Sequence, residues 1–305
     1  MRNNFADELY KIAKSNDKIC ALVADISPAG SMIDFQKKFP MRFINTGVAE
    51  QSMIGIAAGL ALKGMRPFCY TIATFALFRP YEMIRVDLCY QNLPVTIIGM
   101  GAGLIYSTLG STHHSMEDIS IASSLPNMQV LAPCDPLEMR LATRWCANKN
   151  KSPVYMRLGK AGEPIFTENA IDGFKFGKLR YINKGDDVAI ITYGITISLA
   201  NELYLKLKSE KISCSLISCH TIKPIDKKGI INTLKTHKKT IIIEEHIPTG
   251  GISSKIKEIA IDNNLNSKIY SFTLKDKFIK FYGSHNELLA RHGLSIKNII
   301  KKIFQ

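Results

Sequence analysis

The chain has 305 residues, 46% of them hydrophobic, which is enough for about two domain cores and excludes a mainly disordered protein. The formal net charge is +14, and most of the excess lies in residues 166–305, which carry 23 basic and 13 acidic side chains. The lysines occur in dispersed pairs such as Lys238-Lys239, which is typical of solvated helix faces. We therefore expect no nucleic-acid binding.

The cysteines and the apolar stretches indicate where the protein resides. The seven cysteines show no C-x-x-C spacing, which favours free thiols in a reducing compartment over a disulfide framework. The longest apolar stretches, residues 52–62 and 95–106, are too short to span the ~30 Å of a bilayer core. Residues 1–14 lack the apolar region of a signal peptide. We expect a cytoplasmic protein that makes no membrane contact.

Residues 1–165 alternate between short β-branched runs and longer stretches of helical period. The expected strands cover residues 19–26, 67–72, 95–100, 129–134 and 153–158. The expected helices cover residues 3–14, 49–62, 81–90, 116–124 and 136–147. Strands separated by helices predict a parallel sheet covered on both faces, so this part of the chain forms one three-layer domain.

A second series of the same kind follows a short connection. The pattern lapses into Gly, Pro, Asn and charged residues, and we assign residues 166–184 as a linker. Expected strands then cover residues 188–194, 212–219 and 240–245, and a helix begins after the pair Gly250-Gly251. The predicted fold class is α/β, with two successive three-layer parallel-sheet domains at residues 1–165 and 185–305.

Glu50 is out of place in its surroundings. It stands near the start of a helix otherwise built from Ala, Gly, Ile, Leu and Met. An acid in the first turn of a helix is favoured by the helix dipole, and this alone would explain an isolated glutamate. However, Gly55, Ala58 and Gly59 form a face of small residues that another backbone can approach closely, and a glutamate carried into such an interface needs a partner.

Three aromatic residues follow Glu50 at helical spacing. Phe75, Phe78 and Tyr81 recur at every third position in the segment TFALFRPY. Such a row is compatible with an ordinary helix face in a core.

These two features resemble the thiamine-diphosphate enzymes. Their pyrimidine-binding domain carries a glutamate followed at fixed spacing by glycines, a pattern that Glu50, Gly55, Ile56 and Gly59 match. The aromatic row resembles the transketolase pocket for the aminopyrimidine ring, and the resemblance to transketolase extends over essentially the whole chain. It implies a pyrimidine-binding domain at residues 1–165 and a transketolase C-terminal domain at residues 185–305.

The resemblance also implies a proton relay. In this family the glutamate shares a proton with the pyrimidine nitrogen N1′, and the neighbouring amino group then removes the thiazolium C2 proton. Glu50 and His113 are the implied catalytic residues, and Glu50, Phe75, Phe78 and Tyr81 the implied cofactor-binding residues. Thiamine diphosphate is the expected cofactor.

One part of a thiamine enzyme is missing from the sequence. These enzymes hold the diphosphate through Mg²⁺ on a Gly-Asp-Gly motif in a separate domain, and this chain contains no such motif. The resemblance therefore implies one subunit of a split transketolase. A second, diphosphate-binding subunit would supply the Mg²⁺ ligands, in an α2β2 assembly with active sites between subunits.

Further positions are carried over from the family. His113 in GSTHHSMED matches a histidine that contacts substrate hydroxyls, although a surface turn would also suit it, and His114 beside it could line the site. Asp25 matches an aspartate near the thiazolium, although a lone acid at a strand end is more often a cap. Arg2 and Lys160 fall near positions that bind a sugar phosphate, and either could equally be exposed to solvent.

Two positions depart from the family pattern. Leu109 stands where transketolases have an acid that reads a donor hydroxyl, and Gly101 stands where they have a phosphate-binding histidine. The sequence therefore leaves open the identity of the donor and acceptor sugars and whether they are phosphorylated. The C-terminal stretch EEHIPTGG resembles a largely structural loop of the same superfamily, and we expect no metal site in this chain.

Three functions are compatible with these residues. The first is a transketolase subunit that passes a two-carbon ketol unit from a ketose to an aldose. The second is a 2-keto-acid decarboxylating thiamine enzyme, similar to a deoxyxylulose-phosphate synthase or a keto-acid dehydrogenase β-subunit. The third is a catalytically silent scaffold or basic binding subunit. The intact Glu50, aromatic row and His113 favour an enzyme, and the spacing of the aromatics favours the transketolase.

Overall fold

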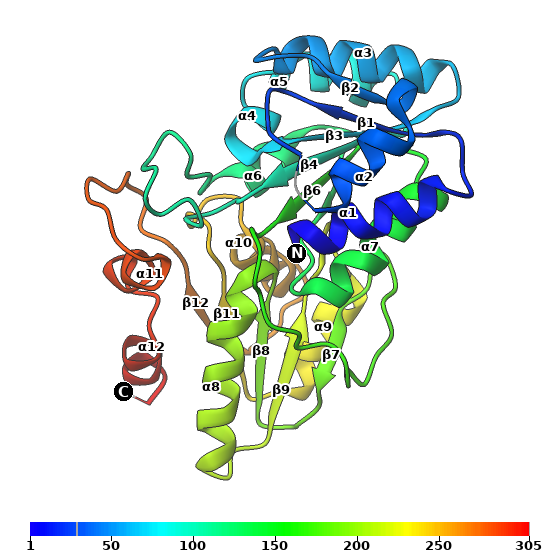
Figure 1. The fold of residues 1–305 in the computed structure, drawn as a ribbon. Helices are drawn as coiled ribbons and strands as arrows, with labels where there is room; N and C mark the ends of the chain where they lie inside the picture. Colours follow the sequence, from blue (N-terminus) through cyan, green and yellow to red (C-terminus); the bar gives the residue numbers. More distant parts are fainter. Residues whose placement is uncertain (29, 305) are drawn as a thin grey trace.

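The computed structural model describes residues 1–28 and 30–304, which form two sheets flanked by helices (Figure 1). The first sheet has the strand order β10-β5-β6-β4-β3-β1-β2. Its strands are β1 (Ile19–Val23), β2 (Phe43–Asn45), β3 (Arg66–Ile72), β4 (Thr96–Met100), β5 (Gln129–Leu131), β6 (Val154–Leu158) and β10 (Thr221–Lys223). All neighbours pair in parallel except β10, which is antiparallel to β5.

Helices cover both faces of the first sheet. In β1, Ile19, Ala21 and Val23 belong to one core cluster and Cys20 and Leu22 to another, which is why this strand reads as a continuous apolar run. One face carries α1 (Arg2–Ala13), α2 (Ser31–Lys38) and α7 (Pro136–Asn148), with the 3-10 turn η1 (Pro40–Arg42) beside them. The other carries α3 (Glu50–Leu62), α4 (Ala73–Leu77), α5 (Tyr81–Met83), the π-helical segment η2 (Ile84–Tyr90) and α6 (Asp118–Ser124).

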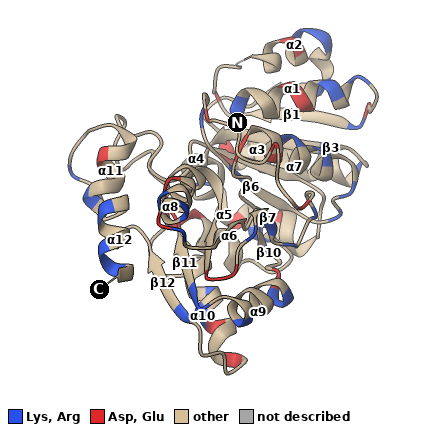
Figure 2. Ribbon diagram, turned by 90° about the horizontal axis from the view of Figure 1, so that it is seen from below, with Lys and Arg blue, Asp and Glu red and all other residues tan. Residues whose placement is uncertain are grey.

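The second sheet is built in the same way, with the strand order β12-β11-β8-β9-β7. Its strands are β7 (Arg180–Asn183), β8 (Val188–Thr192), β9 (Cys214–Ser218), β11 (Lys239–Ile243) and β12 (Lys268–Phe272). Its helices are η3 (Gly194–Thr196, a 3-10 turn), α8 (Ile197–Ser209), α9 (Lys227–Thr236), α10 (Ile252–Asp262), α11 (His285–His292) and α12 (Ile296–Phe304). Figure 2 shows the lysines and arginines of this part spread over several helices, including α9, α10 and α12.

The α/β class with helices on both faces of mostly parallel sheets is confirmed, and two edge strands refine it. We expected two purely parallel sheets in succession. Instead β7, which lies within the expected linker at residues 166–184, pairs antiparallel with β9. Residues of β10 cross back from the second part of the chain to pair with β5, where they satisfy backbone groups of a strand that would otherwise be an open edge.

The buried side chain of Arg157 forms hydrogen bonds with residues of both domains. Its side chain is buried in β6, and its Nε donates to Asp118 Oδ2 at 2.9 Å. Its Nη2 donates to the carbonyl oxygen of Glu245, just past β11, at 3.0 Å. Tyr155 also donates to Asp118, at 2.8 Å, so both charges are paired inside the protein. One core cluster likewise contains residues of both sheets, including Ile97 of β4 and Ile242 of β11.

We predict that Arg157→Met destabilises the protein by about 3–5 kcal/mol, because it leaves the buried Asp118 carboxylate without its cation. Urea unfolding, followed by circular dichroism, measures the change. Lys206→Met is the control, since Lys206 pairs with Glu210 on the exposed surface and its loss should leave the midpoint nearly unchanged. Equal midpoints for Arg157→Met and the wild type would contradict the role of this pair.

Candidate active site

The residues singled out from the sequence lie past the carboxyl ends of parallel strands. Asp25 follows β1, Glu50 follows β2, Phe75 follows β3, His113 lies in the segment after β4 and Lys160 follows β6. Carboxyl ends of parallel strands meet at one edge of a sheet, where ligands of open α/β folds bind. This topology explains how residues more than a hundred positions apart reach one region.

Glu50 is the first residue of α3 and is only 4% exposed. Arg79 Nη1 donates to both of its carboxylate oxygens, at 3.0 and 3.1 Å. The buried acid therefore has its partner within the same chain. A cavity of about 410 Å³ lies beside the pair, lined by Val48, Ala49, Glu50, Gln51, Ser52 and Arg79.

Arg79 is a residue of the candidate site that sequence reasoning missed. Its guanidinium carbon lies 4.1 Å from the centre of the Phe75 ring, and its side chain is 47% exposed. A flat group that bears N–H donors thus stacks on an aromatic ring while it bonds the buried carboxylate. The signal was present in the sequence, because Arg79 is the one cation inside the aromatic segment TFALFRPY.

The three aromatics do not share one environment. Phe75 lies on α4 and meets the His113 ring edge to face, with centroids 5.2 Å apart. Phe78 and Tyr81 are half-buried and pack on the core cluster of α3. The Tyr81 hydroxyl donates to the carbonyl of Ile121 at 3.1 Å, so it faces α6. Of the expected row, Phe75 alone is joined to Glu50 through a described contact, by way of Arg79.

His113 lies between two aromatic rings. Besides Phe75, it contacts Tyr106, with ring centroids 5.9 Å apart, and its Nδ1 bonds the Thr112 hydroxyl at 2.9 Å. Partial burial and the nearby charge of Arg79 lower the pKa of His113. The imidazole is therefore neutral at neutral pH and able to accept a proton.

His114 and Asp25 lie apart from these contacts. His114 is buried, and its Nε2 donates to the Tyr106 carbonyl at 3.2 Å. Burial lowers the pKa of His114. Asp25 is exposed with a φ of 46°, and its backbone N–H donates to Asn45 Oδ1 at 3.1 Å. Within residues 1–28 and 30–304, no side-chain contact joins Asp25 to Glu50 or Phe75.

Arg2 and Lys160 lie at one end of a series of contacting residues whose other end is Glu50. The backbone N–H of Arg2 donates to the Lys160 carbonyl at 3.0 Å, and Lys160 Nζ lies 5.5 Å from the centre of the Tyr106 ring. Contacts therefore run without a break from Lys160 through Tyr106, His113, Phe75 and Arg79 to Glu50. We call these residues the contact row. Tyr106 is a second residue that sequence reasoning missed.

Gly101 and Leu109 belong to the same segment as His113. Gly101 has a φ of +67°, and a Cβ built there would overlap the Tyr106 ring. Tyr106 therefore fills the space that a side chain at position 101 would need. Leu109 is exposed, and its backbone N–H donates to the Tyr106 carbonyl at 2.9 Å.

Within the described parts of the chain, no group of three His, Cys, Asp or Glu side chains is placed to hold a metal ion. No helix in the same residues is both long and apolar enough to span a bilayer. The glycine face of α3 is uncovered, since nothing described lies within 4 Å of a Cβ built at Gly55 or Gly59. Ala58, which we grouped with these glycines, is instead buried in the core.

Comparison with known proteins identifies the family. The family model for the transketolase pyrimidine binding domain matches residues 1–162, and the one for the transketolase C-terminal domain matches residues 177–299. One subunit of the apulose-4-phosphate transketolase of Phocaeicola vulgatus is 32% identical over 98% of this chain and 95% of the relative. The 1-deoxy-D-xylulose-5-phosphate synthase of Clostridium perfringens is 34% identical over 97% of this chain, which spans 48% of the synthase.

A solved structure described as a split gene transketolase, inactive beta4 tetramer, has the same fold. It superimposes with a TM-score of 0.86 at 32% identity, over 98% of this chain and 95% of that chain. The resemblance drawn from Glu50, the glycines and the aromatic row is confirmed. This chain belongs to the transketolase family and contains its pyrimidine-binding and C-terminal domains.

Proposed function

We propose that this chain is the pyrimidine-binding subunit of a two-chain, thiamine-diphosphate-dependent transketolase that moves a two-carbon ketol unit from a ketose to an aldose. The observation that carries the proposal is the arrangement of Arg79 on Glu50 and Phe75. A planar N–H donor already stacks on the ring and bonds the carboxylate, and an aminopyrimidine needs these same two contacts. The Arg79 side chain is 47% exposed, and a cofactor ring in the site would take over its contacts with Glu50 and Phe75.

Each residue of the contact row then has a role. Thiamine diphosphate, when bound, supplies the nucleophilic thiazolium carbon. Glu50 holds a proton toward the pyrimidine nitrogen, in a pocket where burial strengthens the interaction. Phe75 supplies the stacking face, and Phe78 and Tyr81 support it from the core side. Asp25 is assigned to the thiazolium side on family resemblance alone.

His113 is proposed to bind a substrate hydroxyl and to accept its proton. Its low pKa keeps the imidazole neutral, and its two aromatic neighbours fix the ring. Arg2 and Lys160 supply positive charge at the Tyr106 end, which supports a sugar phosphate as substrate. His114 is buried against the Tyr106 backbone, so we assign it a supporting role behind the site.

The partner is a second chain that holds the diphosphate and Mg²⁺. The sequence lacks Gly-Asp-Gly, and the related apulose-4-phosphate transketolase subunit and the split gene transketolase are named as parts of divided enzymes. The uncovered face of α3 supports a subunit contact beside Glu50, since Val48 is 70% exposed and Ile56 and Leu62 are exposed next to the bare glycines. We propose an α2β2 assembly.

All seven cysteines are buried and free, which supports a reducing, cytoplasmic location.

The same cofactor site would serve a 2-keto-acid decarboxylating enzyme, and the similarity to the synthase keeps this as the second candidate. A donor screen separates the two, since release of CO₂ from pyruvate marks the second reaction and two-carbon transfer from a ketose marks the first. A silent scaffold would support neither reaction.

We predict that the full chain alone does not bind thiamine diphosphate with Mg²⁺ tightly, because it lacks the diphosphate ligands. Calorimetric titration of the chain, of its Gly-Asp-Gly partner and of their mixture measures this. Only the mixture should bind with micromolar affinity or better. Tight binding by this chain alone would contradict the two-chain assignment.

We predict that Glu50→Gln lowers the turnover of the reconstituted enzyme by about 10²–10⁴-fold, because the amide cannot exchange a proton with the pyrimidine nitrogen. Cofactor retention is measured in parallel by calorimetry. Glu82→Gln, which changes an exposed acid on α5, is the matched control and should keep full turnover. Full turnover by Glu50→Gln with cofactor bound would show that the assigned relay is wrong.

We predict that Gly101→Ala costs more free energy of unfolding than Gly64→Ala. Both glycines have positive φ, at +67° and +84°, so both substitutions carry a backbone cost of about 1–2 kcal/mol. Nothing lies within 4 Å of the Cβ position at Gly64, whereas at Gly101 it meets the Tyr106 ring. Denaturant unfolding should show the excess vanish in a Tyr106→Ala background, and an excess that persists there would contradict the assigned contact.

A further inference from the structure

The segment that carries His113 is a closed loop. Gly103 and Ser115 exchange two backbone hydrogen bonds, at 3.1 and 3.0 Å, which join the ends of residues 103–115. Tyr106 and His113 both lie between these ends. The loop contains no regular helix or strand of its own, so contacts with other segments determine where His113 lies.

Glu245 of the second domain reaches the base of this loop. Its side chain is fully buried just past β11, and its Oε1 accepts a hydrogen bond from the backbone N–H of Leu104. Gly103 makes the approach possible, since a Cβ there would lie 2.6 Å from the Glu245 carboxyl group. His285 Nε2 donates to the same Oε1 at 2.9 Å.

Residues that follow Glu245 form hydrogen bonds with the segment just after the loop. The backbone N–H of Ile247 donates to the Met116 carbonyl at 2.9 Å. His246 Nε2 accepts from the Ser120 N–H at 3.2 Å. At the tip, Ser111 donates to the Ile279 carbonyl at 3.0 Å. All these partners come from the second domain, although the loop itself starts at the end of β4 in the first.

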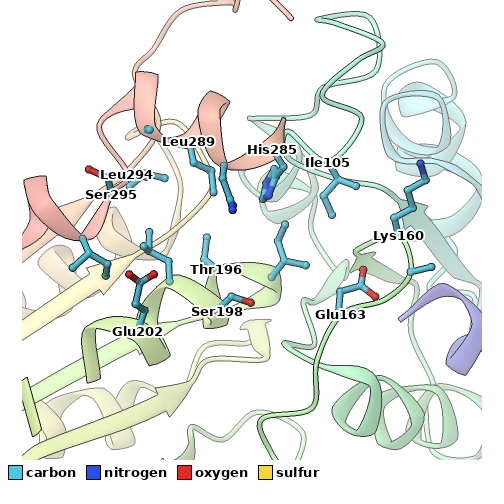
Figure 3. Close-up of a pocket in the computed structure, with 16 residues that line it drawn as sticks. Ile105, Lys160, Glu163, Thr196, Ser198, Glu202, His285, Leu289, Leu294 and Ser295 are labelled. Carbon is cyan, nitrogen blue, oxygen red and sulfur yellow. The ribbon is translucent and has the colours of Figure 1, made fainter. Parts of the chain in front are cut away.

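Neighbouring charges keep the Glu245 carboxyl group ionised. Burial alone would raise the pKa of Glu245, but the charge and hydrogen bond of His285, with Arg157 and the Leu104 amide, hold that pKa below its ordinary value. Burial alone would lower the pKa of His285, but the charge and hydrogen bond of Glu245 outweigh the effect of burial and raise that pKa. Figure 3 shows His285 projecting from α11 into a cavity of about 560 Å³, and its side chain is 28% exposed there.

We propose that Glu245 is a positioning residue for the transferase reaction: through the Leu104 amide and His285, it holds the 103–115 loop and thereby fixes His113 against Phe75. The inference rests on the role proposed for His113. Glu245 touches no reacting atom in this scheme. A carboxylate of the C-terminal domain thus sets the geometry of a site built on the pyrimidine-binding domain, which gives the second domain an indirect part in catalysis.

Amide hydrogen exchange on the full chain tests the structural half without any activity. Glu245→Met removes the acceptor, and protection of residues 104–114 should fall about tenfold or more, because a charge-assisted hydrogen bond is lost. Glu245→Gln keeps an acceptor oxygen and should restore part of the protection. It also decides the outcome if Glu245→Met does not fold.

Glu244→Gln is the matched control. Glu244 is equally buried, but its carboxylate accepts from the Ile252 and Ser253 amides at the start of α10, away from the loop. This variant should change exchange near α10 and leave residues 104–114 as in the wild type. Unchanged protection of the loop in both Glu245 variants would overturn the proposal.

The catalytic half uses the reconstituted enzyme. Glu245→Gln should lower kcat by about 10–100-fold, the effect of a small misplacement of a catalytic group, with cofactor affinity unchanged. In a His113→Ala background the same substitution should have almost no further effect, because both changes act through one group. Fully additive losses would overturn the positioning role. If the wild-type enzyme transfers no two-carbon unit, the proposed function fails, and hydrogen exchange still decides whether Glu245 holds the loop.

Discussion

Convergence of parallel strands at one sheet edge is the constraint on which the site depends. Because β1, β2, β3, β4 and β6 all run the same way, the segments after their carboxyl ends leave the sheet side by side. Glu50, Phe75, His113 and Lys160 are each placed by one of these exits. If one of these strands were reversed, the residue that follows it would lie at the opposite edge of the sheet.

Buried hydrogen bonds of charged side chains cross between the domains and support this edge of the sheet. Arg157 bonds both Asp118 and the Glu245 backbone, and the Glu245 side chain bonds the loop of His113. A buried charge that loses its partner is expensive, so these groups favour one arrangement of the two sheets. The C-terminal domain thereby contributes to the site although the contact row from Lys160 to Glu50 lies in the first domain.

The sequence predicted most of the fold because periodicity and composition are local signals. The strands at 95–100 and 153–158, and the helix beginning near Glu50, fall within a residue or two of β4, β6 and α3. β2 and β10 were missed because these three-residue strands lie in segments without a longer apolar run, whereas β5, which is equally short, lies in the apolar run at 129–134. Arg79 is visible as a cation in the aromatic segment, but its hydrogen bond to Glu50, 29 residues away, is a tertiary contact. The contacts of Tyr106 with Gly101 and of Glu245 with Leu104 were missed as well, because the residues of each pair are not adjacent in sequence.

The transketolase assignment depends most directly on the movement of two carbons between sugars. The decisive measurement follows a ketose donor labelled with ¹³C at its first two carbons, incubated with an aldose acceptor, both chains, thiamine diphosphate and Mg²⁺. The account predicts that both labelled carbons appear together in a longer ketose, and only when both chains are present. Label that stays in the donor while the same mixture releases CO₂ from pyruvate would contradict it.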